Sequence, residues 1–250
     1  MAYTTIDNPE LYFQIKLYTG DASSTSHTLD GDENMQPDLA WFKSRSRTDN
    51  SRIVDALRTT YSIKSNTTSA QVDSGSDGFT SLDADGFTLN GSGGGGEFNA
   101  SSGTYVVWCW KANGAGSANS DGNTTTTKTS ANTTSGFSII TYDGDGAAAT
   151  LGHGLSAVPH LIIQKNIDDT ENWQIYHHKN TSAPETDYLT FTTNATGDQA
   201  SRWNDTAPTS TLITIGSDSS VSQSGESMLM LAWSEKQGFS KFGSYTGNGN

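Results

Sequence analysis

Hydrophobic and polar residues alternate along this chain over short runs that are typical of β-strands. In residues 188–192 successive side chains would point to opposite faces, as in a strand with one face exposed. The runs at 105–110 and 161–163 are continuously apolar, which predicts strands that are buried on both faces. Residues 51–61 have partly helical spacing, but their counterpart at 173–178 alternates, so we predict strands at both places. Frequent turn sequences such as Asp-Gly separate the runs, and the pattern predicts an all-β fold of antiparallel strands.

One ordered set of sequence features occurs twice, about 124 residues apart. The matched positions are mostly apolar residues, glycine or proline, which are the residues that a common scaffold requires. The matched segments are 13–21 with 137–145, 37–43 with 159–165, 50–53 with 172–175, 87–89 with 213–215, and 103–110 with 225–233. Loops of different length explain the small changes in offset, so the sequence predicts one unit that is folded twice.

The repeat divides the chain into two predicted modules. The first covers 1–112 and the second 136–237, and we predict that each is an antiparallel β-sandwich. Between them, residues 113–135 consist almost entirely of Ser, Thr, Gly and Asn, a composition typical of a linker. Residues 238–250 are similar to the start of the second module, so they would either begin a third repeat or close the second module with a strand.

The chain is acidic and poor in apolar residues. Its 27 acidic and 14 basic residues give a formal net charge of −13, which argues against binding to nucleic acid or to anionic membranes. Apolar residues make up 32% of the chain, below the usual ~45–50%, and no apolar run approaches the ~20 residues that span a bilayer. The first residues do not resemble a signal peptide, and the single Cys109 suits a buried thiol. We therefore expect neither membrane insertion nor an internal disulfide.

No group of residues has the spacing of a catalytic or metal-binding motif. The five histidines form no pair at helical metal-ligand spacing, and one cysteine alone provides no zinc site. We therefore expect a protein that is not an enzyme and that has no cofactor. Calcium is an open alternative, because the Asp-rich turns at 30–33, 83–86 and 143–146 offer clustered oxygen ligands. Aspartate also favours turns for purely local reasons.

Six of the 14 basic residues lie within 22 positions of the first module. In an acidic protein such a cluster could dock an acidic protein partner through complementary charge. It could equally be a solvated strand face that balances nearby acids. The residues are Lys43, Arg45, Arg47, Arg52, Arg58 and Lys64. Lys43 is also matched to Lys165 by the repeat, and we interpret this pair as solvated lysines at strand ends.

The second module carries aromatic residues that are candidate carbohydrate contacts. Aromatic faces stack on sugar rings, and neighbouring Asn and Asp side chains would bind the sugar hydroxyls. The alternative is that these side chains pack in the core. The residues are Trp173, Tyr176, Tyr188 and Trp203.

Several segments resemble a module that recurs in structural proteins of tailed bacteriophages, particularly marine ones. In the second half they are Phe-Ser-Ile-Ile-Thr-Tyr-Asp-Gly at 137–144, Gly-His-Gly-Leu at 152–155, Trp-Asn-Asp-Thr-Ala-Pro-Thr-Ser at 203–210 and Gly-Phe-Ser-Lys-Phe-Gly-Ser-Tyr-Thr-Gly-Asn-Gly at 238–249. The first half has the looser Asn-Met-Gln-Pro-Asp at 34–38 and Asp-Gly-Phe-Thr-Leu at 85–89. The resemblance implies concanavalin-like, laminin-G-like or jelly-roll β-sandwich modules in series along tail fibres or other virion appendages. It implies no catalytic residues.

Resemblance and composition together lead to one main hypothesis and two alternatives. We expect a non-enzymatic virion structural protein, part of a tail fibre or similar appendage, assembled in the host cytoplasm and exposed on the particle exterior. Its expected partners are other virion proteins, a host-surface glycan or receptor, and further copies of itself, because weak single contacts gain from multivalency. A capsid decoration or head-fibre protein is the closest alternative. The second is a soluble carbohydrate-binding lectin or a polysaccharide-degrading enzyme.

Overall fold

The computed structural model describes residues 4–91, 95–192 and 196–249, and it is all-β with several antiparallel sheets. This confirms the fold class that the alternation predicted. The helical elements of the described residues are single short turns: η1 (Pro9–Leu11), η2 (Gly95–Glu97), α1 (Ala200–Trp203) and α2 (Ser219–Ser222). None of these helices has the length and apolar character needed to cross a membrane.

The first half of the chain forms two sheets. The larger has six strands in the order β1 (Phe13–Thr19), β9 (Thr104–Trp110), β3 (Leu39–Ser44), β4 (Arg52–Asp55), β5 (Tyr61–Lys64) and β6 (Val72–Asp73). The smaller has three strands in the order β2 (Thr25–His27), β8 (Gly86–Leu89) and β7 (Phe79–Asp83).

The second half also forms a large sheet and a small one. The larger has five strands in the order β10 (Lys128–Asn132), β11 (Phe137–Asp143), β18 (Ser227–Trp233), β13 (Leu161–Asn166) and β14 (Gln174–His177). The smaller pairs β12 (Ala149–Gly152) with β17 (Leu212–Ile215), and a further pair joins β15 (Asp187–Tyr188) to β16 (Gly197–Asp198). The strands predicted within 51–61 and 173–178 are present as β4 and β14.

Strand order and register repeat between the two halves. The order β1-β9-β3-β4 in the six-stranded sheet corresponds to β11-β18-β13-β14 in the five-stranded sheet. Trp110 lies opposite Phe13 in the first, and Trp233 lies opposite Phe137 in the second. The pairing of β2 with β8 matches that of β12 with β17 in the same way. The segments that the sequence alignment matched therefore occupy equivalent strands in equivalent registers.

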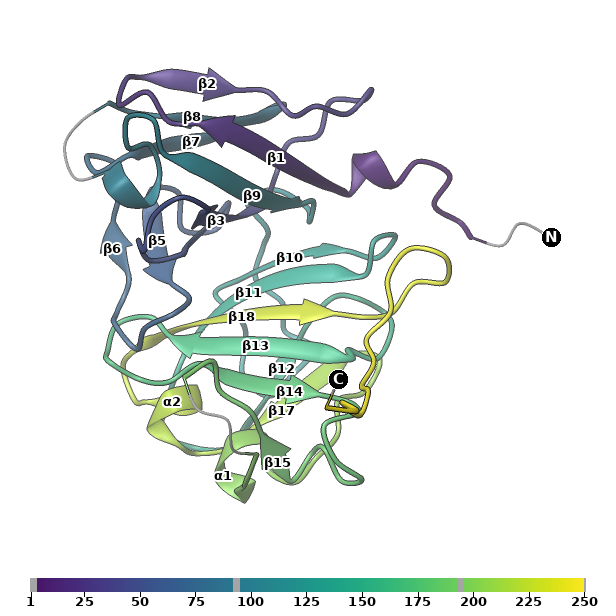
Figure 1. Cartoon of the computed structure of the whole chain (residues 1–250). Helices are drawn as coiled ribbons and strands as arrows, with labels where there is room; N and C mark the ends of the chain where they lie inside the picture. Colours follow the sequence, from purple (N-terminus) through teal and green to yellow (C-terminus); the bar gives the residue numbers. More distant parts are fainter. Residues whose placement is uncertain (1–3, 92–94, 193–195, 250) are drawn as a thin grey trace.

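The sheets are stacked in the order three-stranded, six-stranded, five-stranded and two-stranded (Figure 1). Each half has a hydrophobic cluster between its own large and small sheets, exemplified by Phe42 and Phe87 in the first half and by Ile140 and Ile213 in the second. A third cluster lies between the two large sheets and combines residues of both halves, among them Leu39 with Leu231. The halves are therefore packed together through a common inner core.

The apolar run at 105–110 is fully buried on one face only. Tyr105, Val107 and Cys109 of β9 are fully buried between the six-stranded and three-stranded sheets. The intervening residues of β9 are half-buried, and on the neighbouring β1 the side chains of Ile15 and Leu17 are 48% and 54% exposed. The prediction of burial on both faces is therefore wrong here, because the five-stranded sheet leaves this corner of the six-stranded sheet uncovered.

The Ser- and Thr-rich segment at 113–135 contributes to the sheets. Its residues Lys128–Asn132 form β10, which pairs with β11 at the edge of the five-stranded sheet. Upstream, Ser117 forms a backbone bridge with Thr129, and Thr124 forms one with Leu151. Thr and Ser are compatible with strands, so composition alone did not distinguish an edge strand from a linker.

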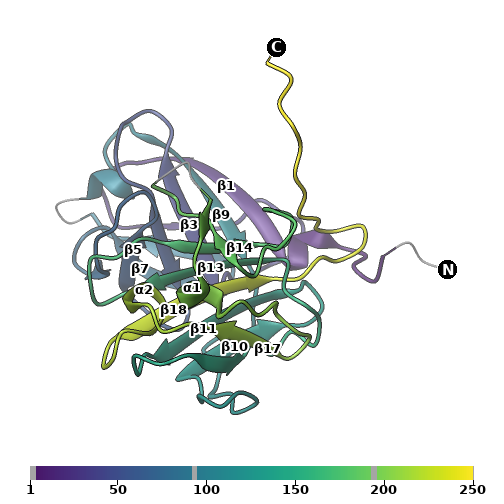
Figure 2. The ribbon, with the colours of Figure 1, turned by 90° about the horizontal axis from the view of Figure 1, so that it is seen from below.

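The C-terminal segment forms a loop beside η1 and then runs outward (Figure 2). The ring of Phe239 lies 6.3 Å from that of Tyr12, and Phe242 packs against the inner core. Residues 238–249, the described part of the predicted closing strand, contain no strand.

Candidate functional site

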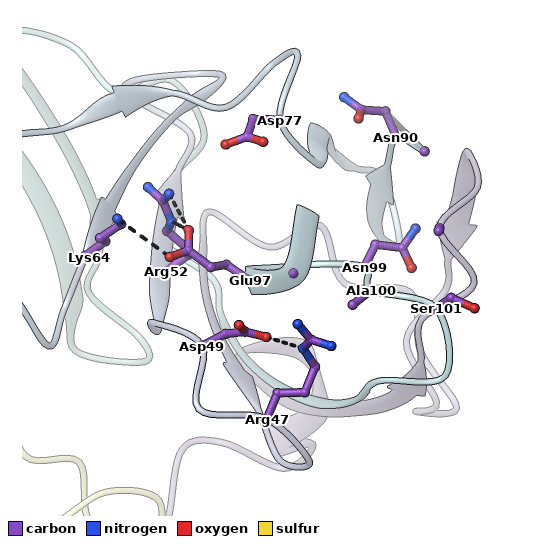
Figure 3. Close-up of a pocket in the computed structure, with 13 residues that line it drawn as sticks. Arg47, Asp49, Arg52, Lys64, Asp77, Asn90, Glu97, Asn99, Ala100 and Ser101 are labelled. Atoms are coloured by element: carbon purple, nitrogen blue, oxygen red, sulfur yellow. Dashed lines mark hydrogen bonds and ion pairs between the residues drawn. The ribbon is translucent and has the colours of Figure 1, made fainter. Parts of the chain in front are cut away.

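A polar hollow of about 670 Å³ opens in the first half of the chain (Figure 3). It lies where β4 and β5 meet η2 and the loops that follow β3, β6 and β8. Most of the lining residues lie on loops that connect these strands. Its charged and amide side chains are Arg47, Asp49, Arg52, Lys64, Asp77, Asn90, Glu97 and Asn99.

Glu97 interacts with three polar side chains on one wall of the hollow. Its carboxylate accepts a hydrogen bond from the Arg52 guanidinium and another of 2.6 Å from Asn50 Nδ2, and Lys64 Nζ lies 3.6 Å away. Arg52 also donates from Nη1 to Ser62 Oγ at 3.0 Å. Because Arg52 is only 4% exposed, these charge-assisted bonds hold a rigid wall in place.

Arg47 lines the opposite side and is half exposed. Its Nε donates to Asp49 Oδ2 at 2.6 Å, and this hydrogen bond, together with the Asp49 charge, raises the pKa of the Arg47 guanidinium. Lys43 Nζ donates to the Asp49 backbone oxygen at 3.1 Å, which fixes the loop after β3. The Arg47 Nη atoms make no hydrogen bond to another described residue, and Figure 3 shows them directed into the hollow.

Asp77 lies across the hollow from Arg47 (Figure 3). Its carboxylate makes no hydrogen bond or ion pair with another residue of the described chain. In contrast, Asn99 Nδ2 donates to Asp21 Oδ1 and to the Ser23 backbone oxygen, so Asn99 supports the loop between β1 and β2. The free polar groups of the hollow are therefore concentrated on Arg47 and Asp77.

The predicted basic docking surface is not present as an exposed cationic patch. Arg52 and Arg58 are buried and paired with Glu97 and Asp55, respectively. Lys64 lies near Glu97, and Lys43 is half-buried. Of the six residues only Arg45 and Arg47 are exposed, and Arg47 is bound to Asp49. Asp49 and Asp55, which are close in sequence, pair with Arg47 and Arg58, and the distant Glu97 pairs with Arg52, so the six residues form no continuous exposed cationic surface.

The matched lysines anchor loops. Lys165 is 0% exposed, and its Nζ donates to the backbone oxygens of Asn166 and Asp169. Burial lowers the pKa of Lys165 to about 8. Lys43 makes the equivalent contact to Asp49 in the first half. The interpretation of this pair as solvated lysines is therefore wrong for Lys165.

Three of the four candidate carbohydrate aromatics are core residues. Trp173 is 0%, Trp203 1% and Tyr176 4% exposed. Tyr188 is half-buried, and the guanidinium of Arg202 lies 4.9 Å from its ring centroid. Trp173 packs in the inner core, and Tyr176 and Trp203 pack in the core of the second half, so these three rings offer no exposed face for a sugar.

The Asp-rich turns are stabilised locally. Asp30 pairs with Lys16, Asp83 accepts from Ser81 Oγ and Thr88 Oγ1 at 2.6 Å each, and Asp145 accepts from the backbone of Ala147 at 2.9 Å. Among the described residues, no three His, Cys, Asp or Glu side chains come together in a way that could hold a metal ion.

His153 is a fully buried histidine whose two ring nitrogens are both used. The backbone N–H of Leu155 donates to His153 Nδ1 at 3.2 Å, and His153 Nε2 lies 3.3 Å from the Thr209 backbone oxygen. These partners assign the neutral ring with its proton on Nε2. Burial lowers the pKa of His153, and it also lowers the pKa values of His27, His160 and His177.

We predict that the protein loses stability as the pH falls from 7 to 5. The unfolded chain binds protons at its histidines near pH 6.5, whereas the folded chain binds them only at lower pH, so the free energy of unfolding decreases on acidification. Urea unfolding followed by circular dichroism at pH 7 and pH 5 measures this change. The variant His153→Gln should show a smaller decrease. A midpoint that stays constant or rises at pH 5 would contradict the assignment of neutral buried histidines.

Residues 8–250 match the family model DUF7483, which is described as a domain of unknown function. Comparison with curated proteins gave no match, and comparison with solved structures gave none.

Proposed function

The chain belongs to the DUF7483 family, a domain of unknown function, and we propose that it is a non-enzymatic structural protein of a tailed-bacteriophage particle. It forms part of a tail fibre or similar appendage on the particle exterior, together with other virion proteins and further copies of itself. It also contributes to attachment to a host-surface glycan. The observation that carries the proposal is the repeated strand order with an inner core shared between the repeats.

The shared core supports the use of this chain as a rigid building block. The rings of Trp110 and Trp233, which are equivalent in the repeat, lie 6.1 Å apart across the two halves. The indole of Trp173 donates to the backbone oxygen of Lys64 at 3.2 Å, which ties the second half to the first. An appendage assembled from units in series needs each unit to keep its shape under load, and packed interiors have low compressibility.

The two sandwiches are the finer fold that we propose for this unit. Each half encloses its own hydrophobic cluster between a large and a small antiparallel sheet. This arrangement supports two tandem modules of the concanavalin-like or jelly-roll kind, packed through the outer faces of their larger sheets. The packing differs from a flexible tandem array in which a linker alone joins the modules.

The polar hollow supports binding more than catalysis. Glycoside hydrolysis requires one carboxyl group that remains protonated beside a second carboxylate. In the hollow, the Glu97 and Asp49 carboxylates each accept a hydrogen bond from a guanidinium, so they do not form a free carboxyl pair facing the cavity. A capsid-docking role through the basic cluster is disfavoured because four of its six residues, Arg47, Arg52, Arg58 and Lys64, lie within ion-pair distance of a carboxylate.

Purified particles of a phage that encodes this chain test the proposal. We expect the protein to be present by mass spectrometry, and immunogold labelling to place it on a tail fibre or another external appendage. A non-structural protein of the same phage serves as the control for contamination. Absence of the chain from particles that contain all other fibre proteins would overturn the proposal, and labelling confined to the head would favour the capsid decoration role.

A further inference from the structure

Two oppositely charged groups face each other across the hollow with unused hydrogen-bonding capacity. The Arg47 guanidinium is held at Nε by Asp49, which leaves its Nη atoms free to donate. The Asp77 carboxylate, on the loop between β6 and β7, is free to accept. Asp49 holds the Arg47 side chain, and the Asp77 backbone N–H donates to the Ser74 oxygen at 2.9 Å, which anchors the loop that carries Asp77. Anchoring before a ligand binds lowers the cost of binding.

The charge of the lining restricts the class of ligand. Its described residues include three cations, Arg47, Arg52 and Lys64, and three anions, Asp49, Asp77 and Glu97. A phosphate or sulfate site would need an excess of positive charge, and a cation site would need an excess of carboxylates. Here the charges balance, so a charged ligand gains little net attraction.

Neutral hydroxyl groups fit this arrangement. A hydroxyl both donates and accepts, so vicinal hydroxyls of one ring can accept from Arg47 while they donate to Asp77. A volume of about 670 Å³ lies within the range of about 300–1,000 Å³ that is usual for small-molecule sites. The lining is more polar than most such sites, which suits a ligand that carries hydroxyls on most of its carbons.

We propose that the polar hollow binds a neutral, hydroxyl-rich sugar residue of a glycan, with Arg47 and Asp77 as its two direct contacts. This inference rests on the proposed attachment to a host-surface glycan, and it assigns that attachment to the first half of the chain. It also replaces the aromatic residues of the second half as the carbohydrate contacts.

The test compares variants of the full chain on an array of neutral and acidic bacterial oligosaccharides, followed by calorimetric titration of the strongest neutral binder. We expect Arg47→Ala and Asp77→Ala each to weaken binding by about tenfold or more, equivalent to about 1.4 kcal/mol. The matched controls Arg45→Ala and Asp32→Ala remove exposed charges outside the hollow and should bind as the unmodified chain does.

A third variant tests the hollow by filling it. A Cβ atom at Gly96 would lie 3.4 Å from the Asp49 carboxylate, an ordinary contact distance, so the backbone accepts a side chain there. Gly96→Leu should therefore fold and should lose binding. Circular dichroism and the urea midpoint identify any variant that has failed to fold.

Three results would overturn the inference. They are the absence of binding to every neutral glycan on the array, equal binding by all variants, and a preference for acidic glycans that inorganic phosphate competes away. Particle incorporation is measured separately, so a chain that is present in virions but binds no neutral glycan would leave the proposed function standing without this site. Binding that depends on Arg47 and Asp77, in a chain absent from virions, would favour a soluble lectin.

Discussion

Replacement of Trp173 by alanine is expected to lower the free energy of unfolding by about 3–5 kcal/mol. Trp173 is 0% exposed, lies in the inner core and donates from Nε1 to the Lys64 backbone oxygen. Its removal leaves a cavity between the two large sheets and an unpaired carbonyl. Urea unfolding monitored by circular dichroism measures the loss.

Two controls separate this packing role from a binding role. Trp173→Phe retains most of the ring volume and should cost less than the alanine variant, whereas Tyr245→Ala removes a side chain that is 94% exposed and should leave stability unchanged. Because Trp173 joins both halves, the alanine variant should weaken the packing of each half on the other. An alanine variant of normal stability that had lost glycan binding would contradict this account and return Trp173 to the carbohydrate site.

Replacement of Asp55 by alanine is expected to cost about 3–5 kcal/mol, since it leaves a buried guanidinium without its partner. The Asp55 carboxylate is 0% exposed and accepts from Arg58 Nε at 2.7 Å. Its second oxygen accepts from the backbone N–H groups of Leu57 and Arg58 at 3.0 and 3.1 Å, so the same side chain also closes the turn after β4. The urea midpoint of the variant measures the effect.

A double variant shows which part of this cost is electrostatic. In Asp55→Ala/Arg58→Met the uncompensated charge is gone, so the pair should recover part of the stability that the single variant loses. The remaining deficit should reflect the two backbone hydrogen bonds of the turn. A cost below about 1 kcal/mol for Asp55→Ala, the range of exposed ion pairs, would show that water reaches the Arg58 guanidinium.

The repeat was the most useful sequence signal, and its matched segments proved to be equivalent strands. Apolar alternation and the positions of Gly and Pro are local properties of the chain, and they are imposed by the two-residue period of a strand. The same reasoning placed β4 and β14 correctly although one of them had partly helical spacing. It did not show that Lys128–Asn132 would be an edge strand, because an edge strand can be as polar as a linker.

The structure buries or pairs most residues of both candidate sites, for related reasons. The basic cluster was recognised from residues close together in sequence, but the carboxylate that neutralises Arg52 is Glu97, 45 positions away. The aromatic residues were recognised by type, but their exposure depends on which sheet covers them. Asp77 and Glu97, which complete the polar hollow, carried no distinguishing signal in an acidic chain.

Local pattern was thus sufficient for the all-β class, for most strand positions and for the presence of a duplicated unit. Only the folded chain decided that the two large sheets share a core, that Trp173 lies inside it, and that Trp203 lies in the second half's own core. It also decided that most of the six basic residues are paired or buried. The physical reason is that strand formation follows from the period of side chains along the backbone, whereas burial and charge pairing depend on which distant segments meet. The stacking of the sheets decides which distant segments come into contact, and a single sequence does not show this directly.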